Sequence, residues 1–281
     1  GENGDLLLNC GDEGMTQFLT LPLLRSRGVD ELPRLAISHP DTLHAGGAAA
    51  LFEAFQPRRI ALPEGRFRSP ADRRLREEIQ RRRLPAENLA RGDRIGPWCV
   101  LHPAAEDQYR HADDQSLVLL GEFQGLRVLL CPDLGRAGQG ALLERGAGEL
   151  RADVLVAGDL FTTTTYPVLR ADSGGGIDGY IAGLNKLLDV VVPKYLQEGG
   201  TYIIPGHGRI GDEADLVDYR DMVLILRDRI ASMIAKGMTL EQIMATKPTV
   251  DYDLRYGTAA YTPAMFVAAV YRDLTQRKGG K

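Results

Sequence analysis

Residues 34–47 read Arg34-Leu-Ala-Ile-Ser-His39-Pro-Asp41-Thr-Leu43-His44-Ala-Gly46-Gly47, and this stretch decides how the rest of the sequence is interpreted. The apolar run at its start is typical of a strand, the middle of a loop, and the part from Ala45 onward of a helix. Two of the chain's five histidines and one carboxylate lie within six residues on that loop. A strand end holds such side chains in fixed positions, as zinc, manganese or iron requires of its ligands. The stretch therefore predicts a metal site.

Short apolar runs alternate with helical patterns on both sides of this stretch. Strands are predicted at 6–9, 35–38, 59–62, 98–101, 116–121, 126–131, 154–157 and 202–204, and helices at 16–27, 45–55, 70–83, 177–189, 214–236 and 264–274. Residues 116–120 and 127–130, joined through Gln124-Gly125, are predicted to form an antiparallel hairpin, which counts against a purely parallel sheet. Thr239 and Gln242 predict a capping box for another short helix. The predicted fold class is α/β, a layered αββα sandwich.

Two further strand ends carry polar side chains. In residues 200–209 an apolar strand leads to His207, and the glycines on either side of it leave room for a substrate or an ion beside the imidazole. Residues 154–160 form another strand that ends in Gly158-Asp159, for which an ordinary turn is an equally good explanation when the segment is taken alone.

Together these segments resemble the metallo-β-lactamase superfamily. Residues 39–47 are similar to its His-x-His-x-Asp-His-x-Gly-Gly motif, Gly158-Asp159 to its bridging aspartate, and residues 205–208 to the segment with its last metal histidine. The resemblance implies a single αββα domain over 1–275, followed by a tail at 276–281. It also implies a hydrolase in which metal-bound water attacks an ester, a thioester or a related acyl substrate.

The two halves of the sequence resemble different branches of that superfamily. Residues 1–156, through segments such as 112–119 and 129–134, resemble the metallo-β-lactamase-like domain of ComEC-type DNA-uptake proteins. Residues 157–275 resemble soluble hydrolases of this fold related to glyoxalase II. The mixture predicts a recombinant or truncated chain, and it makes a nuclease or DNA-handling module the alternative function.

The resemblance implies metal ligands at His39, Asp41, His44, Asp159 and His207. Asp133 competes with Asp159 for the aspartate position because each half of the chain offers one. We prefer Asp159, which keeps the Gly-Asp pair. His111 stands nearest to the place of the family's third histidine and is a weaker candidate, and we assign His102 to a structural Leu-His-Pro turn.

Departures from the motif reduce this ligand set. Leu43 replaces the motif aspartate and cannot bind a metal, and Asn9 stands where the family has an aspartate that supports the site from behind. The resemblance therefore implies one ion, zinc with manganese or iron as alternatives, on His44, Asp159 and His207, with water in a fourth position. No protein base is assigned with certainty, although Asp41 is a candidate. A degenerate scaffold without chemistry is the third hypothesis.

The net charge and the cysteine content limit which partners and which metal-binding atoms are expected. The net charge of −4 argues against a generally basic, nucleic-acid-binding protein. Ten arginines stand between Arg58 and Arg83, but acidic residues interleave with them, so we predict a solvated helix face with ion pairs. The three cysteines form no C-x-x-C pair, which leaves nitrogen and oxygen as the metal ligands.

The sequence contains no apolar run long enough for a membrane span, so the chain as given is expected to be soluble. The expected partner is a small-molecule substrate, with DNA as the alternative. The compartment and the oligomeric state are left open.

Overall fold

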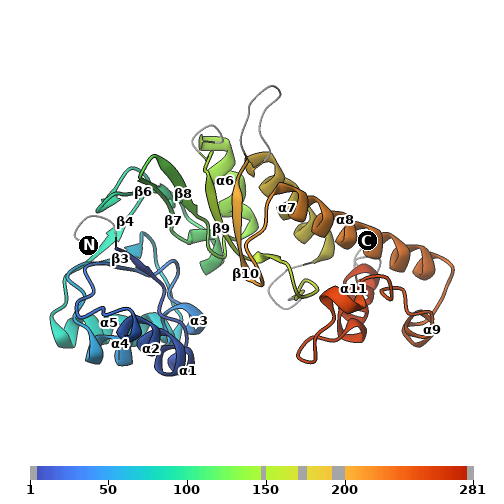
Figure 1. Cartoon of the computed structure of the whole chain (residues 1–281), viewed down its shortest axis with the longest axis horizontal. Coiled ribbons are helices and arrows are strands. Elements are labelled where there is room, and N and C mark those ends of the chain that lie inside the picture. The colour runs from blue at the N-terminus through green and yellow to red at the C-terminus, as the bar shows by residue number, and fades with distance from the viewer. Residues whose placement is uncertain (1–4, 147–149, 170–175, 192–199, 277–281) are drawn as a thin grey trace. The chain divides into compact units, whose positions relative to one another are not determined.

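The computed structural model describes residues 5–146, 150–169, 176–191 and 200–276 (Figure 1). The chain divides into two compact units, residues 1–150 and 151–281, at a point close to the 156/157 junction between the two predicted halves. The predicted tail at 276–281 lies outside the described residues except for Gln276.

The first unit contains two sheets. Its elements in chain order are β1 (Leu7–Leu8), α1 (Glu13–Met15), the π-helical η1 (Thr16–Thr20), α2 (Leu21–Ser26), β2 (Leu35–Ala36), α3 (Thr42–Ala45), α4 (Ala48–Ala54), β3 (Ile60–Pro63), α5 (Pro70–Arg82), β4 (Ala86–Leu89), β5 (Arg94–Ile95), β6 (Trp98–His102), the 3-10 turn η2 (Ala112–Gln115), β7 (Val118–Phe123), β8 (Leu126–Leu130) and α6 (Arg136–Gly146). Strands β1 to β4 form a parallel sheet in that order. Strands β5 to β8 pair antiparallel.

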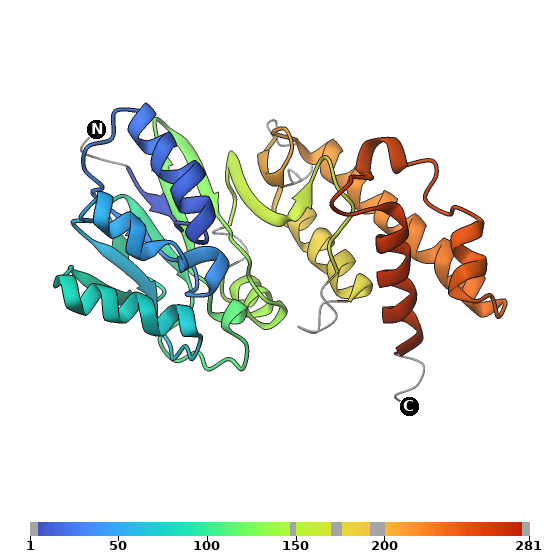
Figure 2. The same ribbon diagram turned by 90° about the horizontal axis from the view of Figure 1, so that it is seen from below.

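The parallel sheet lies between two apolar layers, because successive side chains of a strand point to opposite faces. Ile60 and Leu62 of β3 pack with Leu51 and Phe52 of α4, and helices α2, α4 and α5 cover this face (Figures 1 and 2). Ala61, between them, packs on the other face against residues of the antiparallel sheet, Trp98 and Val100 among them. The first unit is therefore a helix, sheet, sheet arrangement, with α6 in contact with β6.

The predicted hairpin is confirmed: β7 and β8 pair antiparallel from Leu119 with Leu130 to Phe123 with Leu126. Gln124 and Gly125 at its tip both have positive φ, 52° and 83°, as a two-residue hairpin turn requires. The mixed α/β class predicted from the alternation of strand and helix patterns is also confirmed.

The second unit contains two parallel strands and five helices among its described residues. They are β9 (Val154–Thr162), α7 (Ile177–Val191), β10 (Tyr202–His207), α8 (Glu213–Ala235), α9 (Leu240–Ala245), α10 (Asp253–Tyr256) and α11 (Pro263–Gln276). Buried aromatic rings form its centre, with Tyr166 stacked on Phe266 at 4.8 Å and Phe161 edge-on to Tyr219 at 5.6 Å. The capping box predicted at Thr239 and Gln242 opens α9. None of the described helices is both long and apolar enough to cross a membrane.

Gly47 is required where α4 begins, because the chain before η1 passes directly over it. A Cβ at this position would lie 1.7 Å from Thr16 Oγ1 and 2.8 Å from the carbonyl oxygen of Asp12. Thr16 cannot move away easily, since it is buried and its hydroxyl donates to the carbonyl oxygen of Cys10 at 2.7 Å. This close approach holds the helix after the predicted metal loop against the segment that follows β1.

We predict that Gly47→Ala destabilises the protein by about 2 kcal/mol, because the added methyl group overpacks this contact. Gly140→Ala is the matched control: Gly140 lies in α6 with no neighbouring atom within 4 Å of the added Cβ, and alanine favours a helix by about 1 kcal/mol. Urea denaturation of both variants and the wild type measures the difference. Equal midpoints for the two variants would contradict the prediction.

Candidate metal centre

His39 follows β2 on a backbone that is fixed from two sides. The amide of Ser38 donates to Asn9 Oδ1 at 2.8 Å, and the carbonyl oxygen of Ser38 accepts from the amide of Leu117 at 2.8 Å. Asn9 itself has φ 63°, a conformation that asparagine tolerates better than most residues. Asn9 therefore supports the loop from behind, the role that the resemblance implied for its position.

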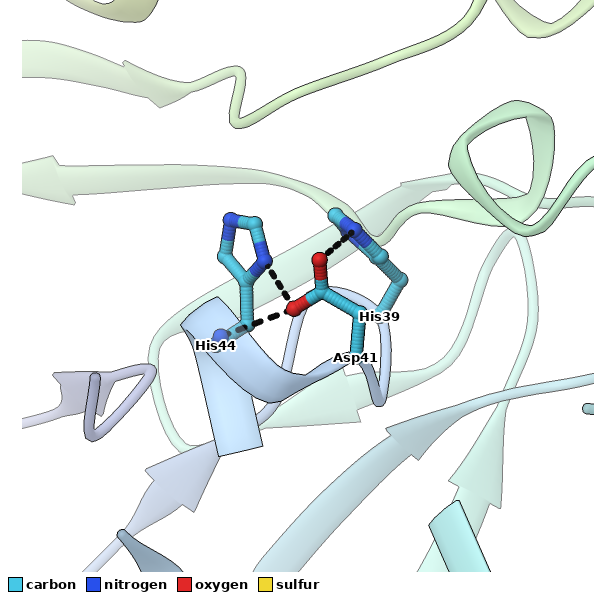
Figure 3. A group of neighbouring side chains, drawn as sticks. All are labelled: His39, Asp41 and His44. Carbon is cyan, nitrogen blue, oxygen red and sulfur yellow. Dashed lines mark hydrogen bonds and ion pairs between the residues drawn. The ribbon is translucent and has the colours of Figure 1, made fainter. Parts of the chain in front are cut away.

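Asp41 joins the loop to α3 through one carboxylate oxygen. Its Oδ1 accepts from the backbone amide of His44 at 2.8 Å, which caps the helix, and from His44 Nδ1 at 2.6 Å (Figure 3). Capping by aspartate satisfies an amide that has no partner within the helix. The same bond to the ring fixes the orientation of the His44 imidazole, so Nε2 is the nitrogen left to face a ligand.

Ser116 determines which ring nitrogen of His39 carries the proton. Its hydroxyl lies 2.7 Å from the carbonyl oxygen of Asp133, to which it must donate because a carbonyl only accepts. With that proton committed, Ser116 Oγ accepts from His39 Nδ1 at 3.0 Å. His39 is 1% exposed. We therefore assign the proton to Nδ1, which leaves the lone pair of Nε2 for a metal.

Carboxylate oxygens surround both Nε2 atoms at one common distance. His39 Nε2 lies 3.5 Å from Asp41 Oδ2 and 3.6 Å from Asp113 Oδ1, and His44 Nε2 lies 3.6 Å from Asp133 Oδ2. These distances are longer than hydrogen bonds. Ligand atoms around a tetrahedral zinc ion, with bonds of about 2.1 Å, lie about 3.4 Å apart.

His39, Asp41 and His44 form a group with one potential ligand atom each, all within 4.8 Å of one another. Their rings and carboxylate converge in Figure 3, and the imidazole centroids are 4.1 Å apart. Two nitrogens and an oxygen at this spacing fit a divalent transition metal.

The electrostatics of the group favour a positive charge. Burial raises the pKa of the Asp41 carboxyl, but the neighbouring imidazoles of His39 and His44, the latter through a hydrogen bond, outweigh it and hold that pKa well below its usual range. Burial lowers the pKa of the His44 imidazole, but the hydrogen bond with Asp41 and the carboxylates of Asp41, Asp133 and Asp113 raise it overall. The carboxylates thus stabilise a proton on His44, and a divalent cation would occupy the same negative field.

Asp113 and Ser116 are site residues that sequence reasoning missed. Both belong to segment 112–119, one of the segments that resemble the ComEC branch. Their neighbour Asp114 is buried and structural, because its Oδ1 accepts from the amides of Ala137 and Gly138 at the start of α6. Two adjacent aspartates on a short turn gave no sign of which one faces the loop.

Asp133 and Asp159, the two candidates for the metal aspartate, lie in different units. Asp133 is beside His44 in the first unit. Asp159 is in the second unit with His207, where Asp159 Oδ1 and His207 Nε2 are 3.5 Å apart. Gly206 is favoured there, because a Cβ would lie 2.9 Å from both the amide nitrogen of Asp159 and the carbonyl carbon of Gly158. The ligand set of His44, Asp159 and His207 draws on both units and stays a prediction.

The other two histidines lie outside the group of potential ligands. His111 is exposed at the start of η2, and its side chain makes no capping bond there. His102 is buried, and its Nδ1 donates to the carbonyl oxygen of Ser116 at 2.9 Å. Burial lowers the pKa of His102. His102 is thus structural, as predicted, and it steadies the residue that orients His39.

Comparisons with known proteins give one relative in sequence. No family model matches the chain. It is similar to ComE operon protein 3 of Bacillus subtilis (strain 168), with 28% identity over 142 residues, which are 49% of this chain and 18% of that protein. The match therefore spans well under two thirds of the relative's length. The resemblance to ComEC-type proteins is confirmed.

Solved structures similar to the chain include members of the metallo-β-lactamase superfamily. A metallo-β-lactamase from Hirschia baltica has a TM-score of 0.41 and 12% identity, with 79% of this chain and 83% of that chain covered. A stereoselective inverting sec-alkylsulfatase from a Pseudomonas species has a TM-score of 0.46 and 16% identity, with 97% and 46% covered.

We predict that Ser116→Ala weakens zinc binding about 10- to 100-fold, because the His39 ring loses the acceptor that holds its Nδ1 proton. Competition with a chromophoric chelator measures the affinity, and Ser116→Thr, which keeps a hydroxyl, is the control. The ¹⁵N shifts of the His39 ring in metal-free protein should report a loss of the fixed tautomer in the alanine variant alone. Wild-type zinc affinity in Ser116→Ala would show that this bond does not orient a ligand.

Proposed function

We propose that this chain is a metal-dependent hydrolase that holds its ion with His39, Asp41 and His44 of the first unit. The observation that supports the proposal is the pair of imidazoles whose Nδ1 protons are both committed, to Ser116 and to Asp41. Both Nε2 atoms then face carboxylates at a spacing suited to a cation. Zinc is our first choice for the ion, with manganese and iron as alternatives.

A bound divalent ion would supply Lewis acidity and lower the pKa of water, which is the chemistry that hydrolysis of an acyl substrate needs. Asp41 serves as a ligand and an orienting group in this proposal and not as the base. Its depressed pKa makes it a weak proton acceptor, and its Oδ1 already accepts two hydrogen bonds.

A substrate would reach the centre from the side where Asp113 and Asp133 lie. The side chains of Asp113 and Asp133 are 55% and 47% exposed, whereas that of His39 is 2% exposed. Leu43, next to His44 in sequence, exposes an apolar side chain. The substrate class that we propose is an ester or a thioester, whose carbonyl group a bound ion would polarise.

The metal content of the purified protein, measured by inductively coupled plasma mass spectrometry, tests this proposal. We expect about one equivalent of zinc, manganese or iron, lost in His44→Ala and kept in His111→Ala, which replaces an exposed histidine outside the group. Hydrolysis of p-nitrophenyl acetate and of an acyl thioester should fall with the metal. If the wild type binds no metal after incubation with each ion, the proposal is wrong and the hypothesis of a scaffold without chemistry is supported.

A His207→Ala variant in the same series separates the two ligand sets. Loss of the metal from this variant would support the set of His44, Asp159 and His207, whereas retention would restrict the ligands to the first unit. Asp159→Asn provides the matching comparison for the carboxylate of that pair.

A second candidate substrate is a phosphodiester, and the arginines between Arg58 and Arg83 favour it. Five of the ten have carboxylate partners, as predicted for a solvated face: Arg58 with Glu31, Arg59 with Glu87, Arg76 with Asp72, and Arg81 and Arg82 with Glu78. Among the described residues no carboxylate partner is found for the exposed Arg66, Arg68, Arg73, Arg74 and Arg83. Arginines without a carboxylate partner can bind the phosphate groups of a polyanion.

The start of α5 connects these arginines to the candidate centre. Ser69, the capping residue of α5, donates from its hydroxyl to the carbonyl oxygen of Pro40, between His39 and Asp41, at 2.5 Å. Arg68 immediately precedes Ser69 in the chain, and Arg66 stands three residues before it. A phosphodiester bound by these guanidinium groups would therefore lie close to the metal loop.

We predict that Arg66→Gln with Arg68→Gln weakens binding of single-stranded DNA about tenfold and lowers the slope of log affinity against log salt by about one to two. The paired arginines give the control, Arg81→Gln with Arg82→Gln, which should change both quantities less. Fluorescence anisotropy at several salt concentrations measures binding, and bis(p-nitrophenyl) phosphate reports hydrolysis. Equal losses in both double variants would assign the effect to general charge, and no DNA binding by the wild type would remove this candidate.

A further inference from the structure

A buried histidine outside the group of potential ligands contacts the residue that orients His39. His102, the last residue of β6, is 1% exposed, and its Nδ1 lies 2.9 Å from the carbonyl oxygen of Ser116. Because a carbonyl oxygen only accepts, Nδ1 carries a proton. The pairing of β6 with β7 shifts register between Val100 and His102, an irregularity of the kind that re-aims a side chain at a sheet end.

Tyr109 and Asp107 close the other side of the His102 ring. Tyr109 Oη lies 3.4 Å from His102 Nε2, and the hydroxyl donates to Asp107 Oδ2 at 3.0 Å. Asp107 Oδ2 also accepts from the amide of Ala104 at 2.9 Å and from the guanidinium of Arg145 at 2.7 Å. Burial raises the pKa of the Asp107 carboxyl, but these hydrogen bonds lower it overall to about 2. Asp107 is therefore an ionised acceptor, to which the Tyr109 proton is committed.

The surroundings of His102 favour its neutral form. Burial lowers the pKa of the imidazole, and the charge of Arg145 acts in the same direction. The bond to Ser116 and the nearby carboxylates raise the pKa, but by less. In the neutral ring Nε2 has no proton to donate, and it faces the Tyr109 oxygen at a distance longer than an ordinary hydrogen bond. The firm hydrogen bond of this ring is thus the one from Nδ1 to Ser116.

Ser116 transmits this bond to the metal loop. Its carbonyl oxygen accepts from His102, while its hydroxyl donates to the carbonyl oxygen of Asp133 at 2.7 Å and accepts from His39 Nδ1 at 3.0 Å. The carbonyl group and the side chain share one Cα atom. A rotation of the backbone that moved the carbonyl oxygen away from His102 would therefore also move the hydroxyl away from His39.

We propose that His102 is a positioning residue for the candidate metal centre, acting through Ser116 to hold the tautomer of His39 whose Nε2 is free for a metal. His102 itself binds no ion in this arrangement. The expected effect on metal affinity rests on the proposed function. The effect on the His39 tautomer does not, because it belongs to the metal-free protein.

Two polar substitutions of His102 separate its two ring nitrogens. The side-chain amide of asparagine reaches about as far as Nδ1, and that of glutamine about as far as Nε2. We expect His102→Asn to keep the bond to the Ser116 carbonyl oxygen, and with it the Nδ1-protonated form of His39 and a zinc affinity close to that of the wild type. His102→Gln should give a mixture of His39 tautomers and bind zinc about tenfold more weakly.

The ¹⁵N shifts of the histidine rings in metal-free protein measure the tautomers, and chelator competition measures zinc affinity. Val100→Ala is the control for lost packing, because Val100 is buried in the same strand between the two sheets. This variant should unfold at a lower temperature and keep the single tautomer of His39. Circular dichroism of each variant checks that it folds.

A single, wild-type tautomer of His39 in folded His102→Gln protein would overturn the role of His102. Tautomer mixing of equal extent in Val100→Ala would also overturn it, because the effect would then belong to sheet packing. A wild-type His102 protonated on Nε2 instead of Nδ1 would do so without any variant. If the wild type binds no zinc, the proposed function is wrong, while the His39 tautomer in the metal-free variants still decides whether His102 positions that ring.

Discussion

The carboxylate of Asp41 is the group on which the candidate centre depends. One oxygen caps α3 and binds the ring of His44, while the other faces His39. A single side chain thus ends the loop, starts the helix and relates two imidazoles to each other. Because all three residues lie within six positions, this part of the site forms from local structure once β2 and α3 are in place.

The layers of the first unit bring the remaining groups to that loop. Ala36 and Ala61 let the antiparallel sheet pack against the parallel one, because small side chains allow two sheets to approach. The close approach carries Leu117 to the carbonyl oxygen of Ser38, and with it Ser116 to His39. The same packing presents Asp113 and Asp133 to the two Nε2 atoms. The first unit therefore brings together side chains that could supply nitrogen and oxygen ligands.

The neighbouring carboxylates change what the incomplete motif indicates about function. Leu43 removes one carboxylate from the loop, yet Asp113 and Asp133 place two others beside the histidines. The loss of a motif residue is therefore weaker support for a scaffold without chemistry than it is when the motif is considered alone.

The sequence by itself determined the elements that depend on local preference. The hairpin at Gln124-Gly125, the capping box at Thr239 and the loop of His39, Asp41 and His44 follow from patterns a few residues long. Strands such as β4 and β5 escaped prediction because they have little apolar alternation and are held by pairing with their neighbours. Only the tertiary structure decided that Ser116, 77 residues from His39, sets its tautomer and that Asp113 faces it. These contacts arise from sheet packing between distant segments, and no local spacing encodes them.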